Sequence, residues 1–172
     1  MQNWETSKDD LAPLDTVNLA IGGTTVKSWE TLYPKLIVPY KPKAIVFYVG
    51  SNDINGGIWS KTGDETFALI KQLFINIEAE LGQVPIYYVS IAPTISRQNV
   101  WQDSNRCNEL MEEYCKEKDN LHFINCTQAL LNSDGSLKKE IYGKDLLHFN
   151  ELGYKIWTPV IRDELNKQYG IQ

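Results

Sequence analysis

The 172-residue chain lacks several patterns that would assign it to a particular functional class. It has only three cysteines, Cys107, Cys115 and Cys126, in an odd number and without the spacing of metal ligands. We therefore expect no disulfide framework and no metal centre, and we interpret the cysteines as buried or idle thiols. No apolar run approaches the ~20 residues that a membrane-spanning helix needs. The absence of Gly-x-Gly-x-x-Gly and P-loop patterns disfavours nucleotide binding.

Positive charge is also scarce. The chain has 17 Lys and Arg against 22 Asp and Glu, which gives a formal net charge of −5 at pH 7. No basic stripe offsets this acidity, so we expect no nucleic-acid partner. A hydrophobic content of 42% and a charged content of 23% are ordinary for a globular protein, and the length predicts a single domain over residues 1–172. No signal peptide is visible, and the sequence is compatible with a cytoplasmic or an exported protein.

Short apolar runs alternate with amphipathic segments along most of the chain. The runs predict strands at residues 16–21, 44–49, 85–91 and 121–125. The amphipathic segments predict helices at residues 26–36, 64–81, 103–118 and 151–168. Such alternation is typical of βαβ units, so we predict an α/β fold with a parallel sheet.

Polar loops follow the predicted strands. They lie at residues 22–23, 50–53 and 92–93 and, beyond the last strand, at residues 145–148. In open parallel sheets the loops at the carboxyl ends of the strands carry the chemistry. We therefore expect these loops to converge at one edge of the sheet and to form the site.

One of the two histidines, His148, follows Asp145 by three residues, just before the last predicted helix. A carboxylate at this spacing can accept the proton of one ring nitrogen and leave the other nitrogen as a general base. The pair would supply two of the three members of a hydrolytic triad. The other histidine, His122, lies within a predicted strand, and we interpret it as structural.

Three of these loops together resemble the SGNH/GDSL family of serine esterases and acylhydrolases. Residues 18–25 (NLAIGGTT) are similar to the second block of the family, and residues 49–53 (VGSND) to Gly-x-Asn-Asp of the third. Residues 145–148 (DLLH) match the last block, Asp-x-x-His, and residues 10–14 (DLAPL) also fit. The resemblance covers nearly the whole chain in the right order. It implies a three-layer α/β/α, flavodoxin-like fold that hydrolyses carboxylic esters through an acyl-serine intermediate, without metal or organic cofactor.

The resemblance also assigns roles to particular residues. The backbone N–H of Gly23 and the side chain of Asn52 would form the oxyanion hole. His148 would act as general base, with Asp145 fixing its tautomer. We expect Asp53 to brace its own loop. The alternative is that the glycine pair and the Asn-Asp pair are ordinary turn residues.

The first block of the family, Gly-Asp-Ser or Gly-Ser-Ser after an opening strand, has no counterpart in this sequence. In relatives the nucleophilic serine precedes a tryptophan such as Trp4 by a few residues, so we expect the serine and its central strand upstream of Met1. A non-catalytic remnant is the alternative. Ser7, Ser28 and Ser51 do not follow a buried strand in the strained turn that exposes a nucleophile, and we expect none of them to serve.

The family handles short acyl groups on carbohydrates, lysophospholipids and thioesters, and the lack of a lid-like apolar insertion favours a small acylated substrate such as an acetyl ester. Trp59 and Trp101 lie in predicted loops near the expected site and are candidate substrate-lining residues. The rival function is a binding module that holds an acylated ligand without hydrolysing it. A flavin or phosphate-signalling domain is disfavoured, because the strand ends lack phosphate-binding loops and an acidic cluster.

Overall fold

The computed structural model describes residues 1–170 and divides the chain into two compact units. The terminal unit comprises Met1–Gly22, Ala92–Gln98 and the residues from Ile124 onward. The sheet unit comprises Gly23–Ile91 and Asn99–Phe123. The single domain over residues 1–172 stays a prediction.

The sheet unit carries a parallel sheet with helices, which confirms the predicted α/β class. Its strands are β1 (Ile45–Phe47), β2 (Ile86–Val89) and β3 (Leu121–Ile124), in the order β1-β2-β3, and the last residue of β3 already belongs to the terminal unit. β1 and β2 run parallel, with Ile45 opposite Ile86. The helices are α2 (Val26–Leu36), α3 (Gly63–Leu81) and α4 (Trp101–Lys116). The short 3-10 helix η1 (Val38–Tyr40) follows α2.

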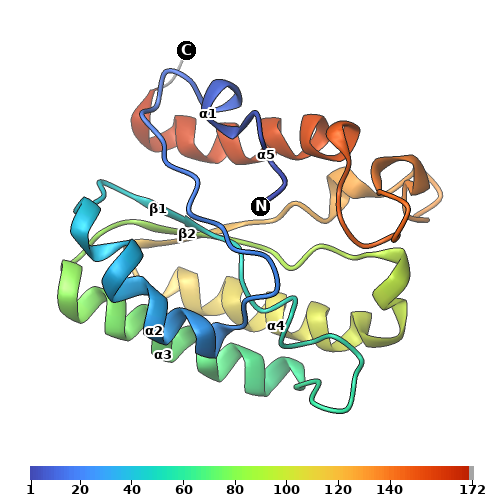
Figure 1. Ribbon diagram of the computed structural model, residues 1–172, viewed down its shortest axis with the longest axis horizontal. Coiled ribbons are helices and arrows are strands. Elements are labelled where there is room, and N and C mark those ends of the chain that lie inside the picture. Colours follow the sequence, from blue (N-terminus) through green and yellow to red (C-terminus); the bar gives the residue numbers. More distant parts are fainter. Residues whose placement is uncertain (171–172) are drawn as a thin grey trace. The chain divides into compact units, whose positions relative to one another are not determined.

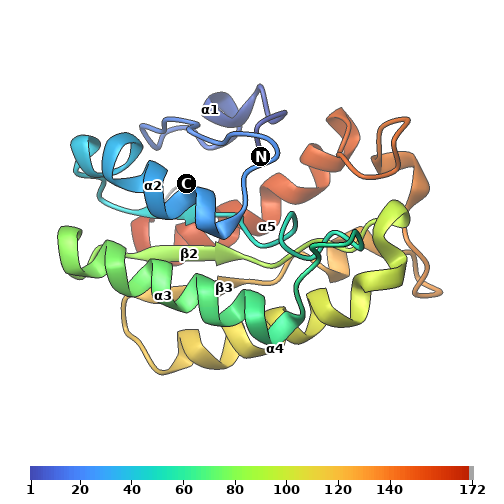
Figure 2. The same cartoon turned by 60° about the horizontal axis from the view of Figure 1, so that its bottom comes forward.

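Helices α2, α3 and α4 lie along one face of the strands in the sheet unit, as Figures 1 and 2 show. A row of aromatic side chains joins these layers. The ring centroids of Trp29 and Phe47 are 5.3 Å apart, and those of Phe47 and Phe74 are 5.8 Å apart. On β3, His122 stacks on Tyr87 of β2 with ring centroids 4.4 Å apart, which confirms its structural interpretation. Burial of these rings supplies much of the apolar area that holds the unit together.

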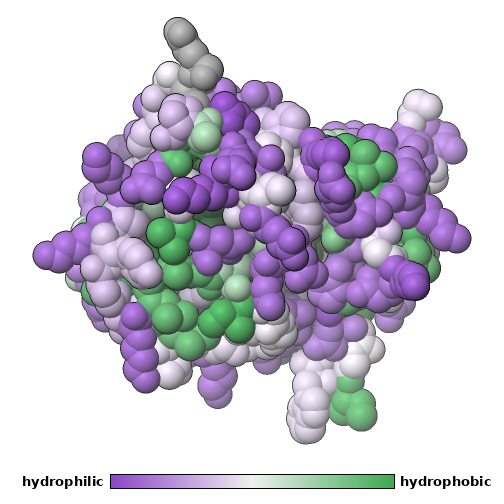
Figure 3. Space-filling view, turned by 45° about the horizontal axis from the view of Figure 1, so that its top comes forward, coloured by the Kyte–Doolittle hydropathy of each residue, from purple (hydrophilic) through white to green (hydrophobic). Residues whose placement is uncertain are grey.

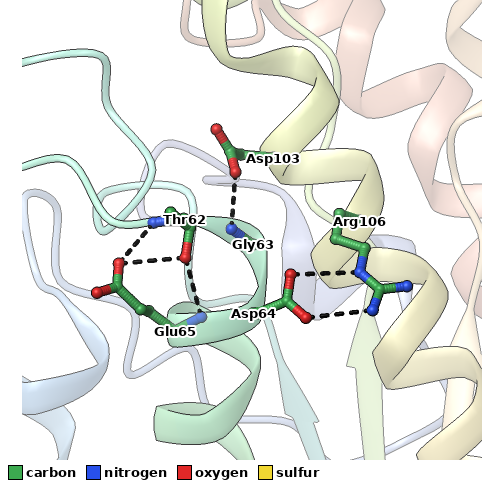
Figure 4. A network of polar contacts seen from close by, with 6 residues as sticks. All are labelled: Thr62, Gly63, Asp64, Glu65, Asp103 and Arg106. Atoms are coloured by element: carbon green, nitrogen blue, oxygen red, sulfur yellow. Dashed lines mark hydrogen bonds and ion pairs between the residues drawn. The ribbon is translucent and has the colours of Figure 1, made fainter.

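The first turn of α3 is fixed by a network of polar contacts (Figure 4). Thr62 and Glu65 form a reciprocal capping box, in which each side chain accepts a hydrogen bond from the other residue's backbone N–H. The carboxylate of Asp103, on α4, accepts from the Gly63 N–H at 3.0 Å. A Cβ at Gly63 would lie 2.4 Å from the Asp103 carbonyl oxygen, so only glycine allows the two helices to approach this closely.

The terminal unit is built on α5 (Glu151–Tyr169), close to the predicted bounds of 151–168. It also contains the short α1 (Ser7–Asp10) and the 3-10 helices η3 (Gln128–Leu130) and η4 (Lys139–Ile141), while η2 (Ile95–Val100) leads from this unit into the sheet unit. Trp4 is 2% exposed and stacks on Tyr154 of α5 at 5.8 Å. The aromatic face of α5 therefore covers the N-terminal segment.

The predicted strand at residues 16–21 is wrong, because the structure has no strand there. The Asn18 side chain instead donates to the backbone oxygens of Met1 and Trp4 and accepts from the Ala20 N–H. The bond with Ala20 is local, and such a side-chain bond competes with a backbone ladder. Within residues 1–170 the sheet thus has three strands, and the family's first central strand is not among them.

On the face drawn in Figure 3 hydrophilic residues predominate. No helix within residues 1–170 is both long and apolar enough to cross a bilayer, and these residues hold no cluster of three or more His, Cys, Asp or Glu side chains arranged to bind a metal ion. Cys107, Cys115 and Cys126 are buried, as interpreted, and are not joined in disulfides, and burial raises the pKa of each thiol to about 12.

Past the end of β2, Asn108 of α4 supplies the hydrogen-bond partners that a neighbouring strand would otherwise supply. Its side chain accepts from the Ile91 N–H at 2.8 Å and donates to the Ile91 carbonyl at 3.0 Å. Asn108 is 6% exposed, so these backbone groups have no ready access to water. We predict that Asn108→Ala lowers the free energy of unfolding by about 2–4 kcal/mol, because two buried backbone groups lose their partner.

Urea unfolding followed by circular dichroism measures this loss. The control is Asn105→Ala on the same helix, whose exposed side chain bonds Glu109 and whose removal should change stability by about 0.5 kcal/mol or less. Equal effects of the two substitutions would contradict the proposed role of Asn108.

Candidate active site

Asp145 and His148 are joined directly in the terminal unit. Asp145 Oδ2 lies 2.6 Å from His148 Nδ1. Its other oxygen, Oδ1, accepts from the backbone N–H groups of Leu147 and His148, both at 3.0 Å. The expected contact between the two side chains therefore forms, and both are more than half exposed. Their catalytic roles stay predictions.

The backbone around this pair is fixed by its own turn. The Gly143 N–H donates to the His148 carbonyl at 2.7 Å, and the Leu146 N–H donates to the Gly143 carbonyl at 3.0 Å. Leu146 has a left-handed φ of 55°, and its carbonyl accepts from the Ser96 N–H at 3.1 Å. The loop is therefore held at both ends and in the middle, which limits the directions in which the histidine ring can point.

Asn150 joins this loop to the last helix. Its side-chain oxygen caps α5 by accepting from the Gly153 N–H, and its N–H₂ group donates to the carbonyls of Glu140 and Tyr142. A Cβ at Gly153 would lie 2.6 Å from the Ile141 carbonyl oxygen, so glycine is required for this close approach. The cap can be predicted from the sequence, because an asparagine directly precedes the amphipathic pattern of the helix. The bonds to Glu140 and Tyr142 cannot be predicted in this way.

The electrostatics of the pair favour a charged Asp145. The bond from His148, followed by those from the backbone N–H groups of Leu147 and His148, lowers the pKa of Asp145 to about 2. The carboxylate is thus ionised throughout the neutral range. A proton on Nδ1 of His148 can be donated to this carboxylate, and in that tautomer Nε2 is the nitrogen that can accept a proton.

We predict that the Asp145 carboxyl is still ionised at pH 3 and titrates with a midpoint near pH 2. In His148→Ala the midpoint should rise toward the ordinary value of about 3.9, because the largest cause of the shift is gone while two backbone bonds remain. Carboxyl ¹³C NMR measures both midpoints. Asp134, whose pKa is lowered by Ser136, is the internal control and should not move. A midpoint unaffected by the substitution would show that the pair does not interact.

Gly23 and Asn52, the two predicted oxyanion donors, both lie in the sheet unit, where Asn52 bonds the residue that follows Gly23. Gly23 has a left-handed φ of 76° and lies two residues before Thr25, the N-cap of α2. A Cβ at Gly23 would have no atom within 4 Å, so its conformation rather than crowding favours glycine. The Asn52 N–H₂ group donates to the Thr24 carbonyl at 3.0 Å, across 28 residues of the chain. The Asn-Asp pair is therefore more than a local turn.

The other candidate residues lie in an exposed loop or in helices. Trp59 is 87% exposed in a loop whose Asn55 side chain donates to the Asn52 carbonyl at 2.8 Å. Trp101 is not in a loop as predicted, because α4 begins two residues earlier than its apolar stripe indicates and Trp101 is its first residue. Ser7 and Ser28 lie in helices α1 and α2, and Ser28 belongs to the capping box of α2. The substrate-lining role of the two tryptophans stays a prediction.

Comparison with known proteins gives the family. The model of the GDSL-like lipase/acylhydrolase family matches residues 2–156. The bovine (Bos taurus) platelet-activating factor acetylhydrolase IB subunit alpha1 is 27% identical over 166 residues, which cover 94% of this chain and 67% of the relative. The human (Homo sapiens) alpha2 subunit is 26% identical over 165 residues, which cover 93% of this chain and 69% of that subunit.

Solved structures share the fold. An acetylxylan esterase from Geobacillus stearothermophilus has a TM-score of 0.71 at 16% identity, covering 87% of this chain and 71% of that one. A GDSL-like lipase from Bacteroides thetaiotaomicron has a TM-score of 0.66 at 21% identity, covering 84% and 72%. Because the family match spans most of the sequence, and includes all four candidate site positions, the chain belongs to the GDSL-like lipase/acylhydrolase family.

Proposed function

We propose that this family member hydrolyses carboxylic esters with His148 as the general base. The observation that carries the proposal is the 2.6 Å bond between His148 and Asp145. It leaves a basic ring nitrogen on an exposed side chain, next to a carboxylate whose pKa is lowered to about 2. A histidine held in one tautomer by an ionised partner is the arrangement that proton transfer to and from a serine requires.

In the proposed reaction a serine hydroxyl attacks the ester carbonyl and His148 takes its proton. The tetrahedral intermediate collapses, and His148 returns the proton to the leaving alcohol. Water then hydrolyses the acyl-serine with the same histidine as base. Gly23 and Asn52 would donate to the oxyanion that forms in both steps, each contributing about 3 kcal/mol. Their mutual connection through Thr24 supports these two roles, because oxyanion donors must be held rigidly.

The substrate we propose carries a small acyl group such as acetyl. The names of the relatives support it, since the curated ones are acetylhydrolases and one structural neighbour is an acetylxylan esterase. The rival function, a binding module that retains an acylated ligand, would not need the histidine as a base.

We predict that His148→Ala lowers kcat for p-nitrophenyl acetate about 10⁴-fold or more, since a triad acts as a unit. Stopped assays on protein from its native source measure the rate, and a fluorophosphonate label followed by intact mass and peptide mapping identifies the nucleophile. His122→Phe is the matched control, because it replaces the other histidine while keeping a ring against Tyr87; its kcat should be unchanged.

The outcomes separate the two functions. Labelling of one serine in the wild-type protein, lost or slowed in His148→Ala, supports the esterase. An adduct on Ser7, Ser28 or Ser51 would overturn our view that these are not nucleophiles. Binding of the acetyl ester without turnover or labelling, and unaffected by His148→Ala, would make the protein a binding module instead.

Trp59 is the stronger of the two substrate-lining candidates, because its ring is exposed on a tied loop. The Ser60 hydroxyl accepts from the Asn55 and Gly56 N–H groups at 3.1 and 3.0 Å, so the exposed ring stands on an ordered turn. We predict that Trp59→Ala raises KM for aryl acetates about three- to tenfold and leaves kcat unchanged, which is the signature of lost uniform binding.

Initial-rate kinetics over a range of ester concentrations test this prediction. Tyr40→Ala, at another exposed aromatic residue of the sheet unit, is the control and should leave KM unchanged. An unaltered KM in Trp59→Ala would show that the ring does not contact the ester.

A further inference from the structure

Two adjacent side chains of the sheet unit hold the segment that follows Gly23 at two points. The Asn52 N–H₂ group donates to the Thr24 carbonyl at 3.0 Å, and Asp53 Oδ2 accepts from the Val26 N–H at 3.0 Å. Val26 is the first residue of α2, and the N-cap between the two bonded positions completes the turn. We call this pair of bonds the α2 clamp. It ties the end of the segment after β1 to the turn that carries Gly23.

Asp53 makes this contact at an electrostatic disadvantage. The residue is 3% exposed, and its second oxygen, Oδ1, is buried without a hydrogen-bond partner among residues 1–170. Desolvation raises the pKa of Asp53, and the Val26 bond and the charge of Lys61 offset this only in part. A buried, half-satisfied carboxylate destabilises a fold, so its presence calls for another benefit.

The N-terminus of α2 supplies that benefit. A helix N-terminus carries a partial positive charge and unpaired N–H groups, which an anion stabilises. The first turn of α2 contains no acidic residue of its own. Asp53 therefore provides, from the segment after β1, the negative charge and acceptor that this helix end lacks.

The α2 clamp lies directly after Gly23 in the chain and therefore affects the conformation of that residue. Gly23 has a left-handed φ of 76°, and because glycine lacks a Cβ its backbone has wide conformational freedom, so contacts of the residues next to it are needed to fix the direction of its N–H. We infer that Asp53 is a positioning residue of the proposed ester hydrolysis: through the α2 clamp it sets the direction in which Gly23 donates to the oxyanion. This inference rests on the proposed function and adds to it a residue that does not touch the substrate.

The test breaks the clamp from either side. Asp53→Ala removes the acceptor, whereas Val26→Pro removes the donor and leaves the carboxylate in place. Proline is well tolerated at the first position of a helix, and the extended Thr25 suits a residue that precedes it. Either change should lower kcat for p-nitrophenyl acetate about ten- to hundredfold with KM within about twofold, less than the loss of an oxyanion donor itself.

Two variants serve as controls. Asp53→Asn keeps an oxygen that can accept from Val26, and should retain kcat within about threefold of wild type. Ser28→Ala breaks the capping box of the same helix end without touching the clamp, and should leave kcat unchanged. Thermal unfolding of every variant shows whether it is folded at the assay temperature, and the Val26→Pro variant carries the test if Asp53→Ala does not fold.

The outcomes distinguish this inference from the proposed function. Wild-type protein without esterase activity overturns both. Active wild-type protein with an unchanged kcat in Val26→Pro or folded Asp53→Ala overturns only the positioning role. An equal loss of kcat in Ser28→Ala also overturns it, because any loosening of the helix end would then suffice. A loss confined to the two clamp variants and rescued in Asp53→Asn supports it.

Discussion

The sheet unit depends on one constraint: its strands pair over only three or four residues, and the backbone must find other partners where the ladder stops. Unpaired buried N–H and C=O groups are costly, so each strand end needs a donor or acceptor from elsewhere. Beyond β2, Asn108 supplies both for Ile91. Beyond β1, the Tyr88 hydroxyl donates to the Val49 carbonyl at 3.1 Å. Side chains that are distant in the sequence thus bond the backbone groups that the short ladder leaves unpaired.

The same requirement explains why site residues and structural residues are hard to separate in this protein. Asn52 and Asp53 satisfy backbone groups of Thr24 and Val26, and in doing so they order the turn that carries Gly23. In the terminal unit, Asp145 satisfies two backbone N–H groups of its own loop with one oxygen and binds His148 with the other. A carboxylate that closes a turn is already fixed in position, so it can orient a histidine with little further loss of entropy.

The sequence predicts those features of the structure that are set by residues close to one another along the chain. The apolar stripe of α3, the buried runs of β1 to β3 and the Asp145–His148 spacing are all local patterns, and each corresponds to the structure. Residues 16–21 have the β-rich composition of a strand, yet the Asn18 side chain bonds the Ala20 N–H, which a ladder would need, and also the distant Met1 carbonyl. The contact of Asn108 with Ile91 spans 17 residues and that of Asp53 with Val26 spans 27. No periodicity encodes such pairs.

Two aspartates of the chain show how environment divides one residue type between two tasks. Asp145 is exposed, accepts three hydrogen bonds and has a lowered pKa, so its ionised form favours the folded state above the ordinary pKa of about 3.9. That contribution is lost as the pH falls toward about 2. Asp53 is buried and its pKa is raised, so its ionised form opposes folding at neutral pH and protonation relieves the penalty as the pH falls. The exposed aspartate stabilises the loop that it orients. The buried one weakens the fold in return for a fixed helix end.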